Sequence, residues 1–71
     1  MEKDWVKLTA VVNAQKAEIM RSLLESEGIP AVVINKRDTM YAVLAYGEVE
    51  LYCHAENALR ALEILENNMP L

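Results

Sequence analysis

The sequence has few of the residues that build covalent or metal-stabilised folds: one cysteine, one histidine, two glycines and two prolines in 71 residues. A single cysteine cannot form a disulfide within the chain, and with one histidine it cannot supply the three or four ligands of a usual zinc site unless a second chain contributes. The low glycine and proline content and the 54% of hydrophobic residues exclude a disordered or collagen-like chain. We therefore expect a globular domain with no cofactor.

Positive charge and long apolar runs are also scarce. The seven Lys and Arg residues are outnumbered by eleven Asp and Glu, which gives a net charge of −4, so we expect no nucleic-acid partner. No apolar run approaches the roughly 18 residues that span a bilayer, and the start "MEKDW" lacks the pattern of a signal peptide. We expect a cytoplasmic protein with no membrane partner, and the unpaired cysteine fits a reducing compartment.

The length predicts one small domain covering residues 1–71. A domain of this size buries only about 60% of its unfolded surface, so its core is marginal. With no disulfide or metal to add stability, association is the remaining source, and we expect a homodimer.

Alternating and helical patterns predict a series of short elements. Period-two alternation indicates strands, and apolar residues spaced three and four apart indicate helices. Asn13 has the side-chain oxygen of a helix N-cap, whereas Gly28 and Pro30 are typical of a helix end. The expected strands are 5–12, 29–35 and 48–53, with a separate strand or extended loop at 41–45, and the expected helices are 14–27 and 55–67.

The order β-α-β-(β)-β-α predicts an α+β fold. Two strands joined by a helix, with a third returning between them, form a mainly antiparallel sheet with both helices on one face. This is a ferredoxin-like sandwich without its final strand, so the first strand becomes an exposed edge. We expect one core beneath the helices, to which Cys53 contributes and which Ile19 widens. Its other members are Leu8, Leu24, Val32, Leu51, Leu62 and Leu65.

Two clusters are candidates for a catalytic or binding role. Cys53 and His54 are adjacent on a strand, so their side chains point to opposite faces and no catalytic dyad is expected. The sheet face without helices is expected to carry Trp5, Lys7, Thr9, Glu50 and Tyr52. Aromatic and charged residues mixed in this way form either a contact surface or an ordinary solvated face, and the sequence leaves both open.

The stretch "INKRDTMY" places Lys36, Arg37 and Asp38 between two apolar runs. Asn35 and Asp38 suit a turn, which needs no positive charge, whereas two adjacent cations could hold an anion or a partner carboxylate. Tyr41 could frame such a site with its ring and hydroxyl. Turn and site both remain open.

Several segments taken in order resemble a known family. They are "NAQKAEIMRSLLESEGIPAVVIN", "GEVELY" and "ALRALEIL". The chain resembles a family of small, mostly bacterial domains of unknown function that are labelled prokaryotic signal-transducing proteins. The resemblance implies a fold related to the PII signal proteins and a regulatory role. It implies no catalytic or binding residues, and Cys53 stands where the family more often has valine.

These observations predict a non-enzymatic regulatory or interaction domain that acts through self-association or binding of a protein partner. The alternative is a small-molecule domain that binds an anionic metabolite at a dimer interface, since so short a chain can hardly enclose a pocket alone. The candidate contact residues are Trp5, Lys7, Lys36, Arg37, Tyr41 and Tyr52.

Overall fold

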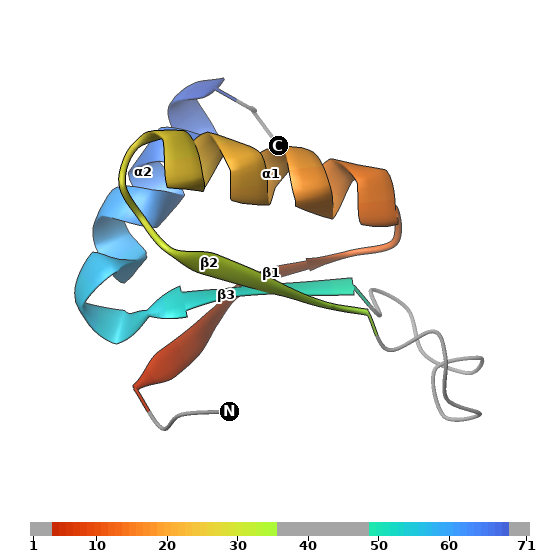
Figure 1. Cartoon of the computed structure of the whole chain (residues 1–71), viewed down its shortest axis with the longest axis horizontal. Helices are drawn as coiled ribbons and strands as arrows, with labels where there is room; N and C mark the ends of the chain where they lie inside the picture. The colour runs from red at the N-terminus through yellow and green to blue at the C-terminus, as the bar shows by residue number, and fades with distance from the viewer. Residues whose placement is uncertain (1–3, 36–48, 69–71) are drawn as a thin grey trace.

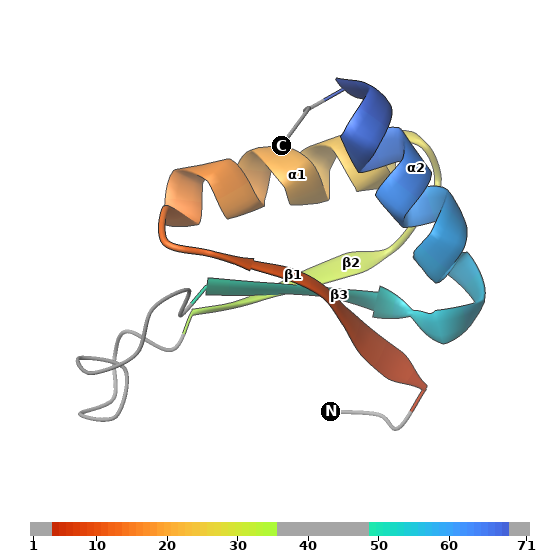
Figure 2. The ribbon, with the colours of Figure 1, turned by 180° about the vertical axis from the view of Figure 1, so that it is seen from behind.

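Three strands form one sheet, and two helices cover one of its faces, in the computed structural model, which describes residues 4–35 and 49–68 (Figures 1 and 2). A 3-10 turn, η3, leads from the last strand into the second helix. The predicted strand or loop at 41–45 lies outside the described residues. The elements are β1 (Trp5–Val11), α1 (Ala14–Ser26), β2 (Ala31–Asn35), β3 (Val49–His54), η3 (Ala55–Asn57) and α2 (Ala58–Asn68).

The strand order in the sheet is β1-β3-β2, and β3 runs antiparallel to both neighbours. The chain crosses from β1 to β2 through α1 and then returns along β3 between them. This confirms the predicted α+β arrangement, a ferredoxin-like sandwich that lacks one strand. Among the described residues β1 pairs only with β3, so it forms one edge of the sheet.

Local interactions set both ends of α1. The Asn13 side chain accepts hydrogen bonds from the backbone N–H of Gln15 at 2.8 Å and of Lys16 at 3.4 Å, which confirms the predicted N-cap. At the other end Gly28 has a φ of 82°, and the Ile29 N–H donates to the Leu24 carbonyl over 2.9 Å. This left-handed glycine and its backbone bonds form a Schellman motif, which ends the helix.

The core lies between the helices and the sheet face that they cover. β3 is the central strand and contributes Leu51 and Cys53, both fully buried. Leu8 packs against this cluster as predicted. The remaining buried members of the cluster are Met20, Leu24, Ile29, Ala31, Ala61 and Leu65.

A β-bulge divides β1. Val6 pairs with Cys53, but the register shifts between Lys7 and Thr9, so that Thr9 pairs with Leu51. Leu8 is the additional residue, and an additional residue exchanges the faces of those that follow it. The prediction that Thr9 lies on the sheet face without helices is therefore wrong, because Thr9 lies on the helix side.

Three apolar residues that the sequence predicts in or beside the core lie outside it in the structure. Val32 is 37% exposed and pairs with Tyr52, while its neighbours Ala31 and Val33 face the helices. Every residue of the segment 31–34 is apolar, so alternation alone does not identify the buried set. Ile19 is 59% exposed, so α1 contacts the core through a narrower stripe than predicted.

Leu62 was also expected in the core and is 43% exposed. Ala61 and Leu65 are buried, and Ile64 packs against them from the other side. The helix is thus rotated so that Ile64 takes the place predicted for Leu62, which lies beside the core instead.

Candidate functional site

The sheet face without helices brings two aromatic rings together at one end. Trp5 and His54 are paired residues of β1 and β3, and their ring centroids lie 4.1 Å apart with planes inclined by 35°. His54 Nδ1 lies 3.3 Å from the Asp4 carboxylate. The candidate residue Trp5 is thus packed against a neighbour within its own chain.

Next to this pair, a nearly buried carboxylate lies on the same face. Glu50 is 8% exposed and accepts a hydrogen bond from the Tyr52 hydroxyl at 2.9 Å. Lys7 Nζ lies 3.5 Å from the other Glu50 oxygen. A cation and a hydroxyl compensate the cost of removing the carboxylate from water. The structure therefore brings Lys7 and Tyr52 together as a polar cluster around Glu50.

Cys53 and His54 lie on opposite faces of the sheet. Cys53 is fully buried beneath the helices, with its sulfur 3.3 Å from the His54 carbonyl oxygen, whereas the His54 ring stacks on Trp5. Burial raises the pKa of the Cys53 thiol above its ordinary value, because the apolar core disfavours the thiolate. The two side chains are placed where they cannot act on each other.

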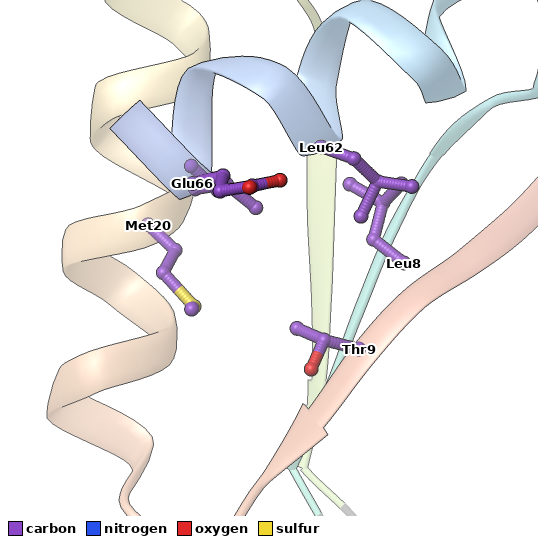
Figure 3. Close-up of a pocket in the computed structure, with 6 residues that line it drawn as sticks. Leu8, Thr9, Met20, Leu62 and Glu66 are labelled. Atoms are coloured by element: carbon purple, nitrogen blue, oxygen red, sulfur yellow. The ribbon is translucent and has the colours of Figure 1, made fainter. Parts of the chain in front are cut away.

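A pocket of about 380 Å³ lies beside β1, on the helix side of the sheet. Figure 3 shows Met20 of α1, Leu8 and Thr9 of β1, and Leu62 and Glu66 of α2 around this space, and Leu65 completes its lining. Its volume falls in the range of small-ligand pockets, roughly 300 to 1,000 Å³. The described part of this lining is apolar except for the Thr9 hydroxyl and the Glu66 carboxylate.

Two structural features produce the pocket. The bulge at Leu8 directs both Leu8 and Thr9 toward it. On α2, Leu59, Leu62 and Glu66 follow at three- and four-residue spacing and form a stripe beside the buried one, which we call the α2 flank. The sequence predicts Thr9 on the sheet face without helices and Leu62 in the core, and it gives Glu66 no role in a site. The spacing of the α2 flank was visible in the sequence, but the bulge was not.

The remaining candidate residues, Lys36, Arg37 and Tyr41, lie outside the described residues. Asp38, where the sequence leaves both a turn and a site open, lies outside them as well. Within residues 4–35 and 49–68, no group of three His, Cys, Asp or Glu side chains could hold a metal ion. Neither described helix has the length and apolar character needed to cross a bilayer.

Comparison with known proteins gives one result for this chain. Searches of curated proteins and of solved structures found no match. A family model with the description "Putative prokaryotic signal transducing protein" matches residues 5–69, which includes every described helix and strand. The chain therefore belongs to this family.

Proposed function

We propose that this domain is a non-enzymatic regulatory module that acts by self-association along β1. The observation that carries the proposal is the free edge: β1 pairs with β3 on one side, and no described residue pairs with its other side. Seven strand residues extend about 23 Å. Lys7 is the only charged residue among them, and a long edge with little charge readily pairs with another strand.

The sheet face without helices is the other surface expected to mediate association, and its side chains are less suited to the task. Trp5 stacks on His54, while Lys7 and Tyr52 contact Glu50. A partner that used these groups would have to replace contacts that already exist. Backbone groups at a free edge have only water to lose, so the geometry favours β1 over this face.

The family description supports a regulatory role, because signal transduction requires a domain to respond to a partner or a ligand. We retain an anionic metabolite at a dimer interface as the alternative expected from Lys36 and Arg37. Replacing both residues with serine should leave the melting temperature within a few degrees, because surface changes usually cost less than about 0.5 kcal/mol. Loss of metabolite-induced stabilisation in that variant would favour the alternative.

Two proline variants test the proposed edge pairing. Consecutive residues in a strand direct their N–H groups to opposite sides, so one of Thr9→Pro and Ala10→Pro removes a ladder donor to β3 and the other removes an outer donor. In analytical ultracentrifugation at high micromolar concentration we expect a wild-type dimer. The variant that lacks the outer donor should be a folded monomer. The variant that lacks the ladder donor should have a lower melting temperature. A wild-type monomer at that concentration would contradict the proposal.

A further inference from the structure

The α2 flank leaves two large apolar side chains in contact with water. Leu59 is 86% exposed, and Leu62 is 43% exposed. They lie one helical turn apart on the same side of α2, with Glu66 one turn further on. Single exposed leucines are common on protein surfaces, but a pair aligned beside an apolar pocket forms a continuous apolar surface.

This surface is continuous with the edge of the sheet. Leu62 and Glu66 line the same pocket as Leu8 and Thr9, which belong to β1 (Figure 3). In a complete ferredoxin-like sandwich the final strand would follow α2 and pair with this edge of β1. The described chain has the helix without that strand, so the side of α2 nearest the edge remains uncovered.

We propose that the occupant of this surface is the α2 flank of a second copy of the chain. This inference rests on the proposed function. Antiparallel pairing of two β1 strands about a two-fold axis perpendicular to the sheet places both α2 helices on the same side of the joined sheet. The two flanks then pack antiparallel over the seam. Leu62, in the middle of the flank, contacts Leu62 of the partner subunit.

Interface size supports the participation of the helices. A stable interface buries about 800 Å² on each partner, which is roughly a sixth of the 4942 Å² surface of this chain. Backbone pairing along one strand supplies hydrogen bonds but little apolar area, and apolar anchors at the centre of an interface contribute most to affinity. Leu59, Leu62 and the pocket add this apolar area.

The charge distribution is compatible with the same arrangement. Among the described residues that line the pocket, Glu66 alone is charged. In an antiparallel helix pair the two Glu66 side chains lie at opposite ends of the contact, each beyond the Leu59 of the facing helix. Their carboxylates are thus kept apart and can remain in water, which avoids the cost of burying like charges.

Substitution of Leu62 with glutamate tests the contact, and Ile19→Glu is its matched control. Ile19 is exposed to a similar degree on α1, where the surface hollow beside it is lined by Gln15, Glu18 and Ser22. In sedimentation equilibrium we expect Leu62→Glu to weaken the dimer at least about tenfold and Ile19→Glu to leave it unchanged. Both variants should keep the wild-type circular dichroism spectrum, because both sites are exposed.

Cross-linking gives a second readout that does not depend on loss of affinity. A Leu62→Cys variant should be linked to its own copy by a short bismaleimide, whereas Ile19→Cys should not, and buried Cys53 gives little background. A monomeric wild type would remove the proposed function and this inference together. A wild-type dimer that resists Leu62→Glu and does not cross-link through residue 62 would overturn this inference alone and leave the pairing of β1 in place.

Discussion

The half of the molecule formed by α1 and β2 differs from the half formed by β1 and α2. α1 has a side-chain cap at Asn13 and a Schellman motif at Gly28, and Arg21 on its outer face forms ion pairs of 2.7 to 2.8 Å with Glu18 and Glu25. β2 is short and follows a proline, which discourages further pairing. The other half has a longer edge strand with a bulge, a pocket and two exposed leucines.

The two halves therefore differ in how much of their surface is left for contact with a partner. In the α1–β2 half, hydrogen bonds within the chain close both ends of the helix, and the edge strand is short. The β1–α2 half leaves an edge and the α2 flank exposed, which is what an association surface requires. In a chain of 71 residues, the exposed half is where a partner would add stability.

The rate at which a thiol reagent labels Cys53 tests whether β3 stays paired with β1 and β2. Cys53 pairs with Val6 of β1 and with Ala31 of β2, and it is fully buried. We expect a thiol reagent to label it roughly a thousandfold more slowly than the unfolded chain, because labelling requires opening of the core. Labelling at the unfolded rate would show that β1 separates readily and that the exposed half is not a stable surface.

Burial of this thiol also predicts how stability changes with pH. The pKa of Cys53 is raised in the folded protein, so its contribution is complete below the pKa of the unfolded thiol and is lost as the pH rises through the folded value. The free energy of unfolding of a Cys53→Ser variant should therefore fall less as the pH rises. Urea unfolding at a series of increasing pH values measures this difference.

A leucine in each half gives the next largest contrast. Leu24 is fully buried where α1 ends, and Leu62 is partly exposed on the α2 flank. Leu24→Ala should cost about 2 to 5 kcal/mol through the cavity that it leaves, whereas Leu62→Ala should cost less than about 1 kcal/mol in the monomer. Urea unfolding at low protein concentration compares the two variants. Equal losses would mean that the halves are equally well packed.

The end of α1 provides a smaller effect. A Cβ atom at Gly28 would meet nothing within 4 Å beyond the two neighbouring residues, so Gly28→Ala isolates the cost of the left-handed backbone at φ 82°. We expect a loss of about 1 to 2 kcal/mol in the free energy of unfolding. Glu27→Ala is a suitable control, since Glu27 has a negative φ of −97°. If Gly28→Ala were harmless, the Schellman motif would not be what closes this half.

The start of α1 should give the smallest loss. Asn13→Ala removes the acceptor of two backbone N–H groups and should cost about 1 kcal/mol. Asn13→Ser keeps a side-chain acceptor and should retain most of this stability. Thermal melts of the two variants and the wild type measure both effects.

Much of the fold could be predicted because it depends on neighbouring residues. Asn13 and Gly28 define the limits of α1 through contacts within a few positions, and the predicted helix at 14–27 differs from α1 by one residue. The assignment of Leu51 and Cys53 to the core also correctly identified the buried face of β3. The element order then led to the sheet order, because few connections between such elements are possible.

The candidate site was harder to predict, since it arises from contacts between distant segments. Trp5, Lys7 and Tyr52 were expected together on one face, and the structure places them there, but the Glu50 contacts that engage Lys7 and Tyr52 depend on the pairing of β1 with β3. The pocket requires the bulge at Leu8 and the rotation of α2. Neither is encoded by a local pattern.

The sequence alone therefore determined the helices, the strands and the α+β class, because hydrogen bonding and apolar spacing within short segments specify them. Only the tertiary structure decided which apolar side chains are buried. β2 could have buried either Val32 or its neighbours, and α2 could have buried either Leu62 or Ile64. Each choice is between two apolar sets of similar size, so the local pattern is satisfied either way. Packing against the rest of the chain selects one set and leaves Leu62 exposed beside the edge of the sheet.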